Sequence, residues 1–272
     1  CFQVDGITEK FGGTAGNIAY ALTLMGEKPI ISAAIGHDYH KYFEWLTLHG
    51  IPTDHIRIVK EEFTAGAYIT TDKADNQITG FNPGAMKYSS NLDFDALDPS
   101  GTILIVSPGN LDDMINYPQA CKTKGIDYIF DPGQSLPMLN PRDLVQAMDG
   151  CRVLICNDYE LDLIISKTGL QKNDLLALSK TIIVTLGEAG SMIITSECET
   201  PIATCKPRQV LDPTGAGDSY RGGLLSGLVR GLDIFECARM GSTCASFAVE
   251  CYGTQTYSFT PEDFQSRLND LK

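Results

Sequence analysis

Residues 210 to 231 read VLDPTGAGDSYRGGLLSGLVRG, and this stretch decides how the rest of the chain is interpreted. A short apolar run gives way to Gly215 and Gly217, which let backbone N–H groups turn toward a ligand. Leucines spaced along one face then predict a helix that stops at Gly231. The glycines therefore lie at the positive end of a helix dipole, where a phosphate group is stabilised.

Asp218 directly follows these glycines and admits two interpretations. It could cap the helix, with the glycines forming an ordinary tight turn. Alternatively, its carboxylate takes a proton from a hydroxyl group that attacks a phosphate. A Walker A loop is excluded because Asp218 and Ser219 stand where that loop needs Lys and Ser or Thr, and Tyr220 replaces the third glycine of the dinucleotide motif. Spacing alone leaves both interpretations open.

The length leaves room for one large α/β domain or two small ones, and one α/β domain over residues 1–272 is the economical architecture. The composition also disfavours two classes of partner. A net charge of -13 would repel nucleic acid and anionic membranes, so neither is expected to bind. The nine cysteines include no Cys-x-x-Cys pair, and the four histidines are not at zinc spacing. We therefore expect reduced thiols and a cytoplasmic protein. No apolar run reaches transmembrane length.

Apolar runs alternate with helical patterns along the chain, which is typical of a mostly parallel sheet. Five of these runs are predicted as buried strands, at residues 29–35, 102–106, 126–130, 152–156 and 181–185. Two β-rich runs, residues 68–71 and 77–81, predict a hairpin because polar residues separate them. Together with a weakly alternating edge strand in residues 1–10, the region 63–82 is predicted to form a small β-sheet lid.

Polar side chains follow two of the predicted strands, where the ligands of an open parallel sheet collect. Asp131 and Gln134 follow the strand 126–130. Asn157 and Glu160 follow the strand 152–156, with a spacing that suits a helix capping box and also a hydrated Mg²⁺ ion.

Small residues open the first predicted helix. Gly12 and Gly13 allow close approach to the backbone, whereas Asn17, taken without further context, is better explained as a capping or packing residue. Phe81 is either a core residue or, at a lid edge, a surface that stacks on a flat ring. Asp38 is expected to cap the helix that follows it.

Four separated motifs together resemble the ribokinase family, the pfkB-type carbohydrate and nucleoside kinases, over nearly the whole chain. They are Gly12-Gly13 with Asn17, Asn157-x-x-Glu160, Thr185-x-Gly187-x-x-Gly190, and residues 212–218, which are similar to Asp-Thr-x-Gly-Ala-Gly-Asp. Pro213 and Thr214 depart from the order of that last motif. The resemblance implies a ribokinase-like three-layer α/β/α domain with a mostly parallel central sheet and a small β-sheet lid.

Four shorter segments look most like bacterial, mycobacterial-type adenosine kinases. These are FNPGAM from Phe81, NDYE from Asn157, SKTG from Ser166 and GTQ from Gly253. The resemblance implies an adenosine kinase that transfers the γ-phosphate of ATP to the 5′-hydroxyl of adenosine, giving AMP and ADP. A ribokinase-like or fructokinase-like sugar kinase is the first alternative, and a non-catalytic nucleoside binder is the second.

The same resemblance implies a role for each motif residue. Asp218 would be the catalytic base, and the backbone N–H groups of Gly215, Ala216 and Gly217 would bind the anion. Substrate contacts are implied for Gly12, Gly13, Asn17, Phe81, Gln134 and Asp218, with Asn17 on a ribose hydroxyl and Phe81 on the adenine ring. ATP contacts are implied for Asn157, Thr185, Gly187, Gly190, Gly215, Gly217 and Gly253. Asn157 and Glu160 would place Mg²⁺, and K⁺ is a further candidate cofactor.

Two expectations concern the edges of the structure. An added lid sheet with an exposed edge predicts a homodimer that pairs through the lid. The first strand of the family, which carries Gly-Ser and a substrate-binding Asp, has no match in this chain, so we expect that strand to be missing. With the other three motifs present, general-base chemistry becomes the favoured interpretation of Asp218.

Overall fold

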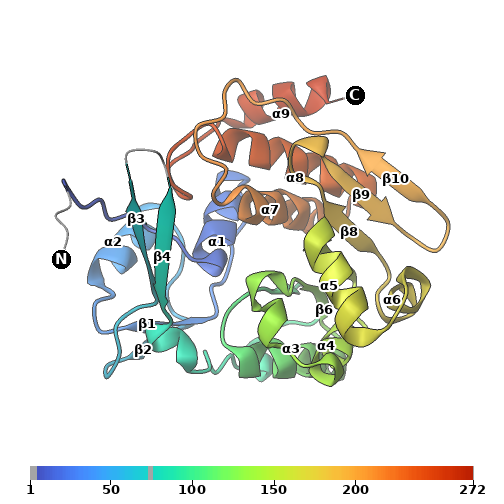
Figure 1. Cartoon of the computed structure of the whole chain (residues 1–272), viewed down its shortest axis with the longest axis horizontal. Helices are drawn as coiled ribbons and strands as arrows, with labels where there is room; N and C mark the ends of the chain where they lie inside the picture. The colour runs from blue at the N-terminus through green and yellow to red at the C-terminus, as the bar shows by residue number, and fades with distance from the viewer. Residues whose placement is uncertain (1–4, 73–75, 272) are drawn as a thin grey trace. The chain divides into compact units, whose positions relative to one another are not determined.

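The computed structural model describes residues 5–72 and 76–271, and the chain divides into two compact units. The first unit joins the residues up to Glu27 to the residues from Cys205 onward, and the second comprises Lys28–Thr204. Figure 1 shows both, coloured from the N-terminus to the C-terminus. The single domain expected from composition stays a prediction.

A six-stranded sheet in the order β10-β9-β8-β7-β6-β5 is the centre of the second unit. Its strands are β5 (Ile103–Val106), β6 (Asp127–Phe130), β7 (Val153–Asn157), β8 (Ile182–Thr185), β9 (Ser191–Ile194) and β10 (Glu199–Ile202). Strands β5 to β8 are parallel, whereas β9 and β10 are antiparallel to their neighbours. The mostly parallel sheet is therefore confirmed. The sequence did not predict β10, because Pro201 argues against a strand except at a sheet edge, which is where β10 lies.

Helices packed on this sheet close the core of the second unit (Figure 1). They are α3 (Leu111–Lys124), α4 (Pro141–Met148), α5 (Asp158–Thr168) and α6 (Lys172–Leu178). Asn110 and Asn140 cap α3 and α4 with their side chains, each accepting from the backbone N–H three residues later. Fully buried Tyr128, Phe130 and Leu154 fill the space between strands and helices.

Two smaller sheets complete the second unit. Strands β1 (Ala33–Gly36) and β2 (Ile56–Val59) pair in parallel around α2 (His40–Leu48), and β3 (Gly66–Thr71) pairs antiparallel with β4 (Gln77–Asn82). The predicted hairpin is thus confirmed. Four short 3₁₀ turns are η1 (Gly84–Lys87), η2 (Phe94–Ala96), η3 (Gly133–Met138) and η4 (Gly187–Ala189).

The expected capping role of Asp38 is wrong. The N-cap position of α2 is Tyr39, and its side chain makes no capping hydrogen bond. The Asp38 carboxylate instead accepts hydrogen bonds from Thr64, a residue 26 positions later in the chain. A long-range partner therefore replaces the local one that the sequence suggested.

The first unit is built on α7 (Ala216–Val229), which packs against α1 (Thr14–Leu24) and α8 (Ile234–Ala248). Glycines allow this packing at backbone distance: a Cβ on Gly222 would lie 2.4 Å from the Cβ of Ala21, and one on Gly223 would lie 2.4 Å from the Met240 carbonyl oxygen. The last helix, α9 (Pro261–Asp270), has Thr260 as its N-cap and Pro261 at its first position.

Residues 5–10 form no strand, so the edge strand predicted in the region 1–10 is wrong for these residues. Phe2 and Val4, on which that prediction also depended, lie outside the described residues. The apolar residues of this stretch are too few to bury a strand face, and Ile7 is almost fully exposed.

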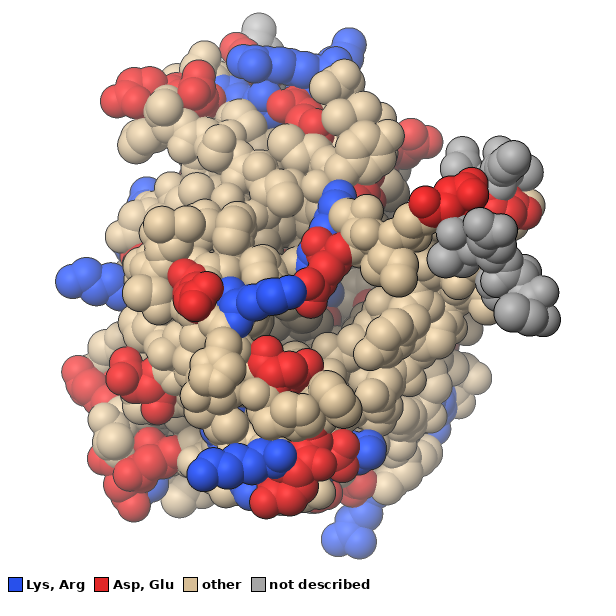
Figure 2. All heavy atoms as spheres, turned by 90° about the vertical axis from the view of Figure 1, so that its left-hand side faces the viewer, with Lys and Arg blue, Asp and Glu red and all other residues tan. Residues whose placement is uncertain are grey.

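The described cysteines are free thiols, and several are buried. Within residues 5–271, as far as they are described, no cysteine pairs into a disulfide, and burial raises the pKa of the Cys121, Cys151 and Cys244 thiols to about 12. On the face drawn in Figure 2, acidic and basic side chains are interspersed. None of the described helices has the length and apolarity needed to cross a membrane.

Candidate active site

Asp218 lies in the first turn of α7 and does not cap it. Gly215 occupies the N-cap position, with a φ of 79° that favours glycine, and Asp218 is the third residue of the helix. The capping interpretation of Asp218 is therefore wrong. Its carboxylate accepts a 2.7 Å hydrogen bond from Asn17 Nδ2 on α1. The positive end of the helix dipole favours negative charge at this position.

The amide of Asn17 is itself held in one orientation. Gln255 Nε2 donates to Asn17 Oδ1 at 3.0 Å, so the Asn17 amino group faces Asp218. Both amides are almost completely buried, with exposed fractions of 4% for Asn17 and 1% for Gln255. Asn17 is not a helix cap either, because Gly13 is the N-cap residue of α1. A buried chain of hydrogen bonds therefore fixes one oxygen of the Asp218 carboxylate.

The turn that precedes α7 is fixed by Asp212. Its carboxylate accepts hydrogen bonds from Thr214 N at 2.9 Å and from Gly253 N at 3.0 Å. Partial burial raises the pKa of Asp212, but hydrogen bonds from Thr214 and Gly253 and the nearby Lys10 ammonium outweigh it and leave the pKa below its ordinary value. The turn 212–215 and the loop at Gly253 are thereby tied together.

Each glycine of this turn lies either where a side chain would clash with a neighbouring residue or where the backbone must remain accessible to a ligand. A Cβ on Gly215 would lie 2.7 Å from Thr254 Cγ2. The Ala216 N–H donates to the Pro213 carbonyl at 3.2 Å, which closes the turn. Ala216 could therefore serve as an anion donor only by sharing or releasing this bond, and the expected set of three donors is weakened at that position.

Arg221 brings a positive charge to the same turn of α7. This side chain is buried, and its Nη1 donates to the Gly217 carbonyl at 3.0 Å. Side chains of a helix lean toward its N-terminus, which places the guanidinium beside the turn that carries Asp218. In a chain with a net charge of -13, this local cation is what an anionic ligand at the helix start requires.

In the second unit, Asn157 and Glu160 form the capping box of α5. Asn157 Oδ1 accepts from Glu160 N at 2.7 Å, and Glu160 Oε2 accepts from Asn157 N at 2.8 Å. The capping interpretation is therefore confirmed for this pair. A carboxylate and an amide oxygen with further acceptor capacity also suit a hydrated Mg²⁺ ion, which takes one or two carboxylates plus water and phosphate oxygens. No group of three His, Cys, Asp or Glu side chains suitable for a metal occurs among the described residues.

The nucleotide turn lies next to this capping box. Asn157 ends β7 in direct register with Thr185, which ends β8. Gly187 and Gly190 follow with φ values of 58° and 91°, and a Cβ on Gly190 would lie 2.1 Å from the Ile202 carbonyl oxygen. The structure thus brings two separately predicted motifs together at the carboxyl edge of neighbouring parallel strands.

Gln134 lies at the carboxyl end of the next strand, β6. It is exposed on η3, whose last carbonyls accept hydrogen bonds from Lys167 Nζ at 3.0 Å and 2.9 Å. Asp131 is buried just before it and accepts from Ser107 Oγ. Phe81 lies apart from these residues, on β4 of the two-stranded sheet, and is not a core residue because 55% of it is exposed.

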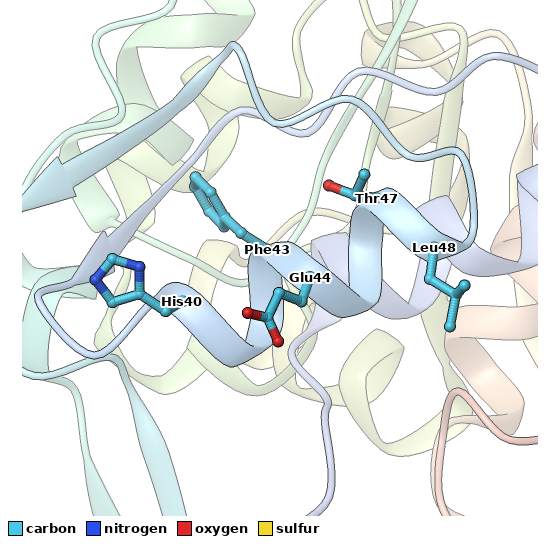
Figure 3. Close-up of a pocket in the computed structure, with 5 residues that line it drawn as sticks. All are labelled: His40, Phe43, Glu44, Thr47 and Leu48. Carbon is cyan, nitrogen blue, oxygen red and sulfur yellow. The ribbon is translucent and has the colours of Figure 1, made fainter.

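A hollow on the surface of α2 contains none of the predicted residues. Figure 3 shows its lining, which consists of His40, Phe43, Glu44, Thr47 and Leu48. All five side chains come from a single helix, so they cannot converge on a substrate from several directions as a binding site requires.

Comparison with known proteins adds the family to this geometry. The sequence pattern of the pfkB family carbohydrate kinases matches residues 3–262. The chain belongs to the pfkB family. It is therefore a member of a family of kinases, with a ribokinase-like α/β fold, and its family pattern spans both compact units.

Several pfkB relatives are named for nucleosides. A nucleoside kinase of Methanocaldococcus jannaschii is 34% identical over 269 residues, covering 98% of this chain and 88% of the relative. The ligand-free structure of Burkholderia thailandensis nucleoside kinase matches with a TM-score of 0.92 and 34% identity, covering 98% of this chain and 88% of the other. The same enzyme in complex with inosine matches with a TM-score of 0.93 at 32% identity, with 99% and 89% covered.

Four residues that contact the candidate site in the structure were not assigned a role from the sequence. These are Asp212, Arg221, Thr254 and Gln255. Asp212, Thr254 and Gln255 lie inside motifs that were quoted without a role for these side chains. The signal for Arg221 was a charged residue on an otherwise small and apolar helix, which predicts a buried polar function.

Proposed function

We propose that this pfkB kinase is an ATP-dependent adenosine kinase that transfers the γ-phosphate to the 5′-hydroxyl of adenosine. The observation that carries the proposal is the 2.7 Å hydrogen bond from Asn17 to Asp218, in the first turn of a helix that opens with Gly215 and Gly217. A carboxylate held in place beside an anion-binding helix end is the arrangement that activates a hydroxyl group for attack on a phosphate.

In the proposed mechanism Asp218 accepts the proton of the attacking hydroxyl as the oxygen–phosphorus bond forms. Asn17 keeps the carboxylate oriented, because its own amide is fixed by Gln255. The backbone N–H groups at Gly215 and Gly217 and the dipole of α7 stabilise the charge on the transferred phosphoryl group. Arg221 adds a fixed positive charge beside them. Magnesium, when bound with ATP, would neutralise charge on the phosphate oxygens, and Asn157 and Glu160 are the residues proposed to hold it.

The other substrate contacts are proposed residue by residue. Gly12 and Gly13 would admit the ribose close to the backbone, Gln134 would face the nucleobase edge and Phe81 would stack on its ring. The ATP contacts would come from the carboxyl edge of β7 and β8 and from the two glycine turns. They are proposed as Asn157, Thr185, Gly187, Gly190, Gly215, Gly217 and Gly253.

A nucleoside acceptor is favoured over a bare sugar by two observations. The relatives that match nearly the whole chain at 34% identity are named nucleoside kinases, whereas a ribokinase of Bacillus subtilis is 23% identical. An exposed aromatic ring at Phe81 and an exposed amide at Gln134 suit a flat base with polar edges. Adenosine in particular rests on the four adenosine-kinase-like segments that begin at Phe81, Asn157, Ser166 and Gly253.

A coupled assay of ATP consumption tests the proposal. Adenosine, inosine, cytidine, ribose and fructose are offered separately at equal concentration, and kcat/KM is compared. We expect adenosine to give the highest value. A higher value for inosine or cytidine would leave the nucleoside kinase in place and remove adenosine, whereas a higher value for ribose or fructose would favour a sugar kinase. Nucleoside binding by calorimetry without any turnover would favour a non-catalytic binder.

Three further properties belong to the proposal. A homodimer that pairs through the β3–β4 sheet is supported by the exposed apolar side chains there, among them Tyr68 and Ile78, and light scattering at working concentration tests it. K⁺ dependence is tested by replacing K⁺ with a large organic cation in the kinase assay. A cytoplasmic location rests on the cysteine spacing in the sequence.

A further inference from the structure

The β3–β4 hairpin is held in place almost without burial of its own side chains. Tyr68, Ile78 and Phe81 are 68%, 80% and 55% exposed. A two-stranded hairpin of this kind is at best marginally stable by itself, so its own ladder does not fix its direction. In Figure 1 the two strands form a ribbon that rises from the region of β1 and β2. The contacts at this root must therefore decide where the hairpin points.

One end of the root is a pair of hydrogen bonds between Asp38 and Thr64. Asp38 Oδ1 accepts from Thr64 N at 2.8 Å and from Thr64 Oγ1 at 2.6 Å. Thr64 Oγ1 in turn accepts from Gly36 N at 3.1 Å. The hydroxyl thus uses both its donor and its acceptor capacity to join the end of β1 to the segment that leads into β3.

The other end of the root is the Phe63 peptide, which passes between two glycines. A Cβ on Gly36 would lie 2.2 Å from Phe63 C, and a Cβ on Gly84 would lie 2.2 Å from Phe63 O. The Ala85 N–H donates to the same Phe63 oxygen at 2.8 Å. The segment that enters β3 and the turn that leaves β4 are therefore fixed at one point, where neither glycine can be replaced without moving backbone.

We propose that Asp38 is a positioning residue for the proposed reaction, because it holds Thr64 and thereby fixes the root of the hairpin that carries Phe81. Phe81 lies two residues before Pro83 and three before Gly84, so a rotation at the root displaces its ring directly. Hydrogen bonds to an ionised carboxylate are among the strong ones, which suits a contact that helps to orient an exposed element. The consequence for the acceptor rests on the proposed function of Phe81.

The chain offers a matched control for Asp38→Ala. Asp98 Oδ1 accepts from Ser100 N at 3.0 Å and from Ser100 Oγ at 2.8 Å, the same pair of bonds, but within a loop and only two residues away. Asp98→Ala therefore removes equivalent bonds without touching the hairpin. Thr64→Val keeps the backbone bond to Asp38 and loses the two hydroxyl bonds, and Thr64→Ser restores the hydroxyl. These milder variants keep the test available if Asp38→Ala fails to fold.

The test combines hydrogen–deuterium exchange with steady-state kinetics on the full chain. In Asp38→Ala we expect the amides of β3 and β4 to exchange about tenfold faster, since the loss of a charge-assisted bond changes a local opening equilibrium by at least that factor. We also expect KM for adenosine to rise about tenfold while KM for ATP is unchanged. Thr64→Val should show a smaller effect, and Thr64→Ser and Asp98→Ala should match the wild type.

Unchanged exchange of the hairpin amides in both Asp38→Ala and Thr64→Val would overturn the proposal. Equal acceleration in Asp98→Ala would overturn it as well, because the effect would then be a general loss of stability. Faster exchange in the Asp38 and Thr64 variants with no change in KM for adenosine would support the role of the root and contradict the acceptor role of Phe81. The two proposals therefore fail in distinguishable ways.

Discussion

The start of α7 and the β3–β4 hairpin both carry proposed substrate contacts, but they are held in opposite ways. At α7, Asn17 bonds to residues 201 and 238 positions away, and its amide is buried. The hairpin exposes nearly all its side chains and is fixed at its root by Asp38 and Thr64. The comparison indicates that catalytic groups need a rigid environment. Groups that cover a substrate can lie on an element that is stabilised by few contacts.

The largest effect is expected from Asp218→Asn, which keeps the shape of the α7 turn and removes the base. We expect kcat to fall by about 10²- to 10⁴-fold, the usual contribution of a general base, while nucleoside binding measured by calorimetry is retained. Asp233→Ala is the matched control, because Asp233 is an acidic residue that caps α8 through Phe235 N and Glu236 N. It should lower Tm and leave kcat unchanged. Turnover by Asp218→Asn within threefold of wild type would remove the base assignment.

The next largest effect is expected from Gly215→Ala. The backbone there has a φ of 79°, and the new Cβ would lie 2.7 Å from Thr254 Cγ2, so the turn must shift. Displacing a donor from the anion site should reduce kcat by about a hundredfold. Gly231→Ala is the control, since its φ is 73° and no atom lies within 4 Å of the added carbon. It should cost about 1 kcal/mol of stability and no activity. Equal kcat values for the two variants would contradict the anion-site role.

A smaller effect is expected on the hairpin. Phe81→Ala should raise KM for adenosine about tenfold, because stacking of a base on an aromatic ring is worth about 1–3 kcal/mol, and it should leave Tm unchanged. Ile78→Ala is the control, because Ile78 lies on the same strand but on the opposite face and is also exposed. An equal change in KM for both variants would show that the hairpin responds to any truncation and that the Phe81 ring has no special role.

The smallest effect concerns Asp212 and pH. Its pKa is lower in the folded protein than its ordinary value, so its contribution to stability is present above that ordinary value and is lost as the pH falls through the lower, folded one. The Tm difference between wild type and Asp212→Asn should therefore be largest near neutral pH and shrink below about pH 4. Thermal unfolding over this range measures it. A constant difference at all pH values would show that the Asp212 bonds do not depend on its charge.

Local signals in the sequence predicted local structure well. The Asn157–Glu160 capping box and the β3–β4 hairpin follow from the spacing of capping residues and from turn chemistry, and the structure confirms each. The prediction for Asp38 was wrong because the capping rule looks a few residues ahead, whereas the carboxylate found stronger donors at Thr64.

The site was predictable as a list of motif residues but not as a set of contacts. Nothing in the spacing of Asn17, Asp218 and Gln255 shows that their side chains meet, because the meeting depends on how α1 and α7 pack. The register of Asn157 with Thr185 could be anticipated, since both end neighbouring parallel strands. Gln255 was quoted within the GTQ segment without a role, because a buried amide in a loop leaves no periodic signal.

The contact between α1 and α7 can form only after the ribosome has synthesised α7. Residue 24 ends α1 and residue 216 begins α7, so a ribosome working at about 5–20 residues per second makes the second helix roughly 10 to 40 seconds after the first. During this interval the small, apolar face of α1 has no α7 to cover it. The second unit, by contrast, can form as its strands emerge in turn. The hydrogen bond between Asn17 and Asp218, the proposed base, therefore forms late in the synthesis of this chain.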